Sequence, residues 1–196
     1  MKETGLLMTP ENYGKTERGD KTHTRRIVQW STWITEDDKL KLSLQRPVTG
    51  LAWYEVGQPI KCFCCPFGMI GDRVYVKEGL EKTSTGDLIQ YGRDKLHLQP
   101  PVMGGAYVWR WRRDTLSPLH MPKWAARLWL EITEVRVERL QEISEWDACA
   151  EGCGDYSITP TAANRRFREL WESIHGPGSW VLNPWVWVIG FRKLRS

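Results

Sequence analysis

The stretch that most constrains the fold is the last apolar segment of the chain, Pro184-Trp-Val-Trp-Val-Ile-Gly-Phe191. Its apolar side chains occupy both alternating phases, a pattern typical of a strand that is buried on both faces. Arg192-Lys193 follow directly and mark the exit to solvent. The segment therefore predicts a strand covered by packed residues on each of its two sides.

A second strong strand is predicted where Leu128, Leu130 and Ile132 share one face. The apolar phase then shifts by one residue, which predicts a bulge near Thr133-Glu134. The other expected strands lie at residues 5–8, 27–30, 51–56 and 73–77, with a weak hairpin at 88–91. Helices are expected at 36–42, 144–151 (behind a capping box) and from Thr159-Pro160 to Gly176, whereas 10–20 are read as turns and 81–106 as a long loop. This pattern favours an α+β domain on a small barrel or a strongly curved sheet.

The bulk composition is that of an ordinary globular protein. The 196 residues are 41% hydrophobic and 27% charged, which excludes a disordered chain and suggests one domain. The net charge of +4 is compatible with an anionic partner such as nucleic acid. No apolar run reaches the length of a membrane span, and the N-terminus does not resemble a signal peptide. We therefore expect a cytoplasmic protein without membrane contact, and reduced cysteines.

The cysteines and histidines do not predict a metal site. Cys62-x-Cys64-Cys65 and Cys149-x3-Cys153 together offer thiolates for zinc, but the C-x-C-C spacing of the first cluster is awkward and the second pair lies across an expected helix end. Reduced cysteines packed beside a Pro-Gly turn are the favoured interpretation, with zinc the alternative. No glycine-rich phosphate loop with the required strand–turn–helix context is present. We expect neither a cofactor nor a metal.

Two polar stretches carry candidate chemistry. Gly19–Arg26 places a lysine, two threonines, a histidine and two arginines in eight residues, which allows a nucleophile beside a base or charge. The alternative is a basic turn before a strand that starts at Ile27. Trp109–Arg113 interleaves aromatic and basic residues, a pattern that stacks on bases and neutralises phosphate, or else forms a basic strand edge.

Several stretches together resemble one family. Gly19-x-Lys21-x-x-Thr24-x-Arg26 is similar to the G-x-K-x-x-T-x-R motif of ASCH domains, which belong to the PUA-like superfamily. Further segments are similar to the larger ASCH-like proteins of phages and prophages, namely Cys65–Glu78, His120–Arg127, Val135–Glu151 and Phe167–Trp180. The resemblance implies a PUA-like fold, a small and mostly antiparallel β-barrel with flanking helices and a cleft for a nucleoside or RNA. Regions 31–58 and 80–118 are then expected as insertions in a single domain spanning residues 1–196.

The resemblance also implies an activity. Small bacterial ASCH enzymes remove the acetyl group from acetylcytidine with a lysine, a threonine and a glutamate, which correspond here to Lys21, Thr24 and Glu151. Expected substrate-binding residues are Arg25, Arg26, Glu78, His120, Trp124 and Arg127. The resemblance therefore predicts an amidohydrolase that acts on a modified cytosine nucleoside or on RNA. Two alternatives stay open: a non-catalytic module that binds RNA or a modified base, and a ribonuclease of the ASCH type.

Overall fold

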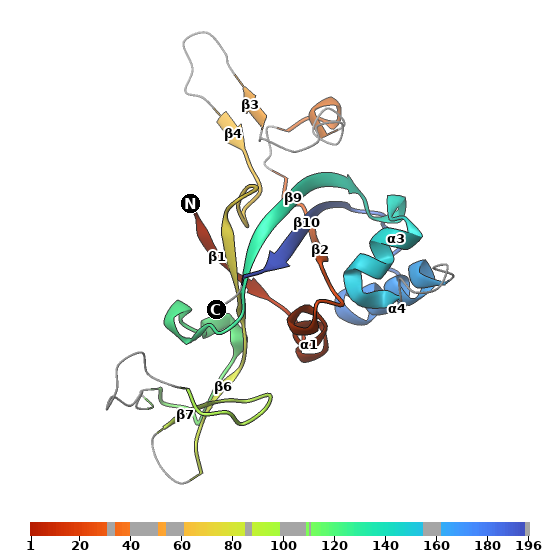
Figure 1. The fold of residues 1–196 in the computed structure, drawn as a ribbon. Coiled ribbons are helices and arrows are strands. Elements are labelled where there is room, and N and C mark those ends of the chain that lie inside the picture. Colours follow the sequence, from red (N-terminus) through yellow and green to blue (C-terminus); the bar gives the residue numbers. More distant parts are fainter. Residues whose placement is uncertain are drawn as a thin grey trace.

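A five-stranded sheet forms the centre of the molecule (Figure 1). The computed structural model describes residues 1–30, 34–39, 51–53, 61–84, 88–98, 109, 111–154 and 162–194. The strand order is β1 (Glu3–Leu7), β5 (Arg73–Lys77), β9 (Trp129–Arg139), β10 (Trp185–Lys193) and β2 (His23–Ile27). Only β1 and β5 run parallel, so the expected mixture of helices with a mostly antiparallel sheet is confirmed. The expected barrel closure is not seen: in the described part of the chain no backbone pairing joins β1 to β2.

β10 is buried on both faces, as its sequence predicts. Trp187 and Ile189 contribute to a core that includes residues of β5 and β9. Val186 and Val188 point the other way and pack in a second core with Phe167. The two phases of apolar residues in this strand therefore serve two different hydrophobic layers.

The predicted bulge in β9 is confirmed. Gly190 pairs with Glu134 and the next residue, Phe191, pairs with Ile132, so Thr133 is left over on β9. An extra residue on one strand bends it and increases its local twist. Figure 1 shows β9 curving over the neighbouring strand β10.

The interpretation of residues 10–20 as turns is wrong, because they form helix α1 (Pro10–Arg18). The Thr9 side chain accepts a hydrogen bond from the Asn12 backbone N–H, and proline occupies the first helical position. Gly19 ends the helix with a left-handed backbone. The capping signals are present in the sequence, but the low apolar content of the segment hides them.

The predicted start of β2 at Ile27 is also wrong, because the strand begins at His23. Thr24 and Arg25, which look like turn residues, are buried in it. Their register is set by β10, where Ile189 lies opposite Thr24. A strand this polar is stable in the interior only because its charged groups find buried partners of opposite sign.

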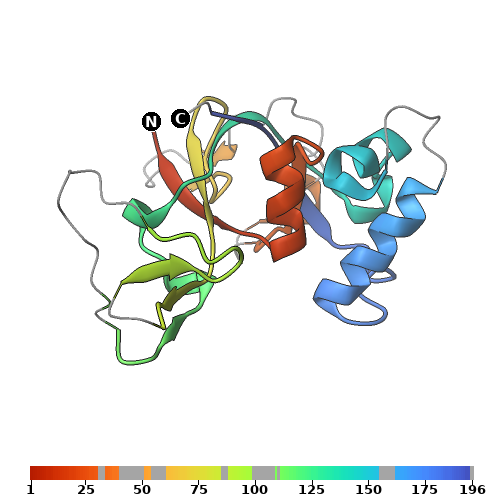
Figure 2. The ribbon, with the colours of Figure 1, turned by 60° about the horizontal axis from the view of Figure 1, so that its bottom comes forward.

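A helical layer covers one end of the sheet, beside α1 (Figure 2). It comprises the 3-10 turn η3 (Leu140–Glu142), helix α3 (Glu145–Ala148), the π-helical turn η4 (Cys149–Cys153) and helix α4 (Ala163–His175). The predicted capping box is confirmed, since Ser144 and Asp147 bond reciprocally. The helix expected from Thr159 begins at Ala163; residues 155–161 lie outside the described part.

Two smaller sheets extend from the central one at opposite ends of Figure 1. One is the hairpin of β3 (Leu51–Trp53) and β4 (Lys61–Phe63), of which β4 was not predicted. The other has the order β7 (Ile89–Tyr91), β6 (Leu80–Lys82) and β8 (Thr115–Leu116), so the expected loop at 81–106 contains strands. Turns η1 (Pro118–His120) and η2 (Lys123–Ala125) follow β8. Residues 36–39 are helical, within the expected helix at 36–42.

Among the described residues, none of the helices has both the length and the apolar character that crossing a membrane requires.

Candidate functional site

Lys21 and Glu151 lie 130 residues apart in the chain and meet in the interior. Lys21 Nζ donates to Glu151 Oε2 at 2.5 Å and to the Glu151 backbone carbonyl at 3.0 Å. The exposed fraction is 2% for Lys21 and 3% for Glu151. Lys21 precedes β2, and Glu151 belongs to the π-helical turn η4. Backbone pairing ties these segments together, because the Thr22 N–H donates to the Ala150 carbonyl at 2.8 Å.

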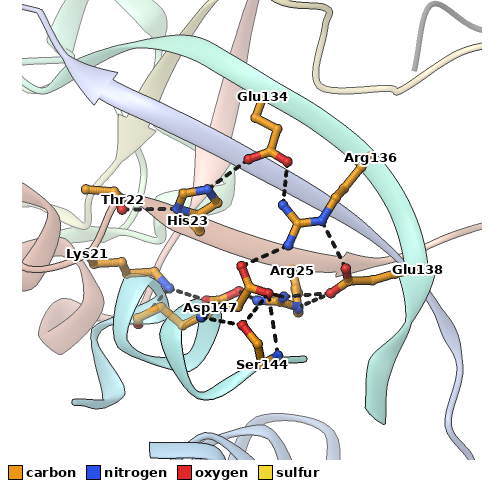
Figure 3. A network of polar contacts seen from close by, with 10 residues as sticks. Lys21, Thr22, His23, Arg25, Glu134, Arg136, Glu138, Ser144 and Asp147 are labelled. Carbon is orange, nitrogen blue, oxygen red and sulfur yellow. Dashed lines mark hydrogen bonds and ion pairs between the residues drawn. The ribbon is translucent and has the colours of Figure 1, made fainter. Parts of the chain in front are cut away.

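A chain of alternating charges continues from Glu151 along the sheet, and Figure 3 shows its members Arg25, Glu138 and Arg136. Arg25 donates to Glu151 Oε1 at 3.1 Å and to Glu138 Oε1 at 2.6 Å. Glu138 in turn accepts from Arg136 at 2.9 Å, and Arg136 also bonds Asp147 at 2.9 Å. Each buried carboxylate therefore has cationic partners, which is the condition for keeping charges inside a protein.

Lys21 is the cation of this network whose pKa is lowered by its surroundings. Burial lowers the pKa of Lys21 from its ordinary value, and the nearby Glu151 carboxylate opposes that effect. Because an arginine does not give up its proton in proteins, Arg25 and Arg136 remain charged. Lys21 is thus the cation of the network whose pKa burial lowers.

A pocket of about 240 Å³ opens beside Lys21. Thr24 and Arg26 line it from β2, and Asn12 lines it from α1. Among the described residues, the buried Asn12 Oδ1 atom has no hydrogen-bond partner. Arg26 also donates to the Leu7 carbonyl at the end of β1, so its side chain bridges the two open edges of the sheet. The structure therefore brings Lys21, Thr24, Glu151 and Arg26 to one place.

Glu78 and Arg127 form a separate cluster on another side of α1. Arg127 donates to both Glu78 oxygens, at 2.8 and 2.7 Å, and its guanidinium lies 3.8 Å from the Tyr91 ring centre. Glu78 lines a second pocket of about 230 Å³ together with Tyr13, whose ring stacks under Arg93. Met8 lines both pockets, so they lie next to each other at the start of α1.

His120 and Trp124 are not brought to either pocket. His120 is exposed in η1, and Trp124 has 49% of its surface exposed in η2. Arg25 lies close to the candidate site but does not line the pocket. Its guanidinium instead donates hydrogen bonds to Glu138 and Glu151. Of the residues expected to bind substrate, Arg26 is thus the one that lines the pocket beside Lys21.

The Trp109–Arg113 stretch is only partly available for stacking. Trp109 is buried in the core of the β6–β8 sheet, and its indole N–H donates to the Arg113 carbonyl at 2.8 Å. Trp111 packs edge-on against Trp109, with 4.9 Å between the centroids of the two rings. Arg112 and Arg113 are exposed. The tryptophan that looked like a stacking platform is therefore a core residue.

The structure identifies functional candidates that sequence reasoning missed. Asn12 and Tyr13 were overlooked because their segment was read as a turn, although the cap at Thr9 signalled a helix. Glu138 and Arg136 were overlooked because they alternate with apolar residues, as solvent-facing residues of a strand do. In the described ranges no group of three His, Cys, Asp or Glu side chains is placed to hold a metal ion. Cys65, Cys149 and Cys153 are buried there and unbridged.

Comparisons with known proteins give little further guidance. No protein-family model matches the chain, and no curated protein matches it. Among solved structures, the fold is similar to an ASCH domain from Lactobacillus crispatus JV V101, with a TM-score of 0.41 and 12% sequence identity. The superposition covers 97% of this chain and 79% of that domain. At this level of similarity, the function has to be argued from the chain's own residues.

Proposed function

We propose that the protein is an amidohydrolase that removes an acyl group from the exocyclic nitrogen of a modified cytosine, with acetylcytidine as the reference substrate. The observation that supports this most is the buried contact between Lys21 and Glu151 at the wall of a pocket that also contains a hydroxyl. Amide hydrolysis needs a nucleophile, a group that takes its proton and a group that protonates the leaving amine. Thr24, Lys21 and Glu151 supply these three types of group.

The lysine and the carboxylate share one mobile proton between them. The reactive form in this mechanism is the one in which that proton has moved from Lys21 Nζ to Glu151 Oε2 across their contact of 2.5 Å. Burial lowers the pKa of Lys21 and favours this transfer, whereas the negative charge of Glu151 opposes it. In the neutral form, Lys21 takes a proton from the nucleophile as the bond to the carbonyl carbon forms. Glu151 gives its own proton to the nitrogen as the C–N bond breaks. The pair ends as ammonium and carboxylate, and one internal proton transfer restores the neutral form.

Thr24 and Arg26 have complementary parts in this mechanism. The Thr24 hydroxyl attacks the amide carbonyl, and a water molecule then hydrolyses the acyl-threonine ester to the free acid; alternatively Thr24 positions that water for direct attack. Arg26 lines the same pocket and presents fixed positive charge to the carbonyl oxygen as it becomes an oxyanion. Arg25 holds Glu151 from behind and is a positioning residue.

A second candidate function is a binding module that accepts a modified base without turnover. One observation favours it: both Glu151 oxygens are already occupied by cations, Lys21 on one and Arg25 on the other. Such saturation is typical of a structural ion network as well as of a resting catalytic site. The two functions differ in whether product is formed.

The test is to incubate the purified protein with acetylcytidine and to follow cytidine release by chromatography. We expect turnover by the wild type and a fall of about 10²–10⁴-fold in Lys21→Met, the range for losing one acid–base group. Lys123→Met is the matched control, because Lys123 is an exposed lysine of η2 outside the pocket. Absence of cytidine release by a folded wild type, or full activity of Lys21→Met, would contradict the proposal.

A further inference from the structure

A third pocket, of about 440 Å³, lies between α1 and α4 and has no role in the chemistry proposed above. Lys15 lines it from α1, Arg166 and Leu170 line it from α4, and Gly152 and Cys153 line it from η4. In Figures 1 and 2 these three elements gather beside one another at the same end of the sheet. The pocket is open to solvent at the exposed side chain of Arg166.

This pocket adjoins the one that contains Lys21. A methyl group placed on Gly152 would come within 3.0 Å of Lys15 and 3.3 Å of Lys21, so one glycine separates the two lysines. Leu170 lines the third pocket and Ile174 lines the Lys21 pocket, one helical turn away on α4. Four residues of a helix rise about 6 Å, which is of the order of the distance by which a ribose separates a base from its phosphate. The spacing of the two pockets along α4 therefore matches the spacing of the base and the phosphate in a nucleotide.

The charges of the third pocket suit an anion. Arg166 has no acidic partner among the described residues, although its neighbours Arg165 and Arg168 are placed to pair with Glu169 and Glu172. Lys15 forms an ion pair with Glu11 at 2.7 Å. Because 69% of the Glu11 side chain is exposed, this ion pair is weak, and a phosphate is able to replace Glu11 as the partner of Lys15. Two cations thus face the pocket against one weakly held carboxylate.

Cys153 does not turn the third pocket into a reaction centre. Burial raises the pKa of the Cys153 thiol to about 11. The thiol therefore stays protonated near neutral pH and is a poor nucleophile. The pocket is suited to binding, with arginine and lysine as the groups that recognise phosphate.

We infer that the third pocket binds a phosphate group attached to the nucleoside, so that a nucleotide or an RNA strand binds more tightly than the free nucleoside. The inference rests on the proposed function in placing the base beside Lys21. Arg166 and Lys15 hold the phosphate oxygens, while Glu11 competes for Lys15. The shared chemistry is a phosphate monoester or diester, and its two sources are a free nucleotide and a nucleic-acid strand.

The test measures binding without turnover, so it is independent of the hydrolase assay. Tryptophan fluorescence titrations compare cytidine, cytidine 5′-monophosphate, cytidine 3′-monophosphate and an unmodified single-stranded RNA hexamer. We expect at least one phosphate-bearing probe to bind about tenfold or more tightly than cytidine, as for a hydrogen bond to a charged group. A preference for a monophosphate points to free nucleotides, and a preference for the hexamer alone points to RNA.

Three variants assign the effect to the pocket. Arg166→Ala is expected to remove most of the preference for phosphate, while Arg165→Ala, its exposed neighbour on α4, keeps it. Glu11→Gln is expected to strengthen phosphate binding, because it frees Lys15. Equal affinity for all four probes, no binding by any of them, or the same loss in Arg166→Ala and Arg165→Ala would overturn the inference. Phosphate-dependent binding by a protein that does not hydrolyse acetylcytidine would retain it and reject the hydrolase.

Discussion

Two of the buried glutamates in the described part of the chain, Glu151 and Glu78, each lie beside a pocket and are each followed by a glycine, but different cations hold them. Glu151 is held by Lys21 and Arg25, whereas Glu78 is held by Arg127 through both of its oxygens. Arginine keeps its proton, but burial lowers the pKa of Lys21. Under the proposed function the two ion pairs differ in their roles. The Lys21–Glu151 pair transfers a proton, whereas the Glu78–Arg127 pair is a fixed structural link between the end of β5 and the segment before β9.

The largest expected effect on stability comes from breaking the fixed pair. Arg127→Met leaves the Glu78 carboxylate buried without its bidentate partner, and the free energy of unfolding should fall by about 3 kcal/mol. Urea denaturation measures the change. Arg192→Met is the control, since it removes only an exposed pair with Glu131 and should cost less than about 1 kcal/mol. Equal losses in the two variants would show that the Glu78 pair contributes no more than a surface contact.

The glycines that follow the two glutamates give the next contrast. Gly152 has a left-handed backbone, with φ of 81°, and an added methyl group would press on Lys15 and Lys21. Gly152→Ala should therefore cost about 1–2 kcal/mol and also displace Lys21. A methyl group on Gly79 meets its nearest neighbour at 3.7 Å, an ordinary contact, so Gly79→Ala should be tolerated. Thermal unfolding of both variants measures the difference, and a tolerated Gly152→Ala would contradict the tight packing assigned to η4.

The smallest expected effect concerns the outer end of the Glu151 network. The hydrogen bond from His23, helped by Arg136, lowers the pKa of Glu134 to about 2. Its ordinary value is 4.5, so the stabilisation is complete above that pH and is lost as the pH falls towards 2. In Glu134→Gln the acid limb of the stability–pH profile should flatten, with a loss of less than about 1 kcal/mol at neutral pH because the site is partly exposed. An unchanged acid limb, compared with the surface variant Glu169→Gln, would rule out this contribution.

The sequence predicts the apolar half of the fold well and the polar half poorly. The strands around Val188 and Leu130, and the bulge at Thr133, follow from apolar periodicity, which burial enforces directly. β2 was misassigned because its buried charges have partners that are distant in the chain, and α1 was misassigned because its apolar content is low although its capping signals are present. Arg25 looks like a solvated charge until Glu138 and Glu151 are known to lie beside it.

The candidate site shows the same division. The motif around Lys21 and Thr24 and the helix end at Glu151 are recognisable in the sequence. In the structure Lys21 and Thr24 line one pocket, and Glu151 contacts Lys21. The sequence does not reveal that Arg25 faces the network while Arg26 faces the pocket, because this depends on the register of β2 against β10. The contribution of Asn12 depends on recognising α1 as a helix.

The most direct test of the contrast is the turnover number for acetylcytidine in Glu151→Gln and Glu78→Gln, measured side by side. If the Lys21–Glu151 pair transfers the proton, kcat falls by about 10²–10⁴-fold in Glu151→Gln. Glu78→Gln then changes kcat by less than about tenfold, and any effect on substrate binding appears in KM. An equal loss of kcat in the two variants, or a larger loss in Glu78→Gln, would contradict the assignment of proton transfer to Lys21 and Glu151.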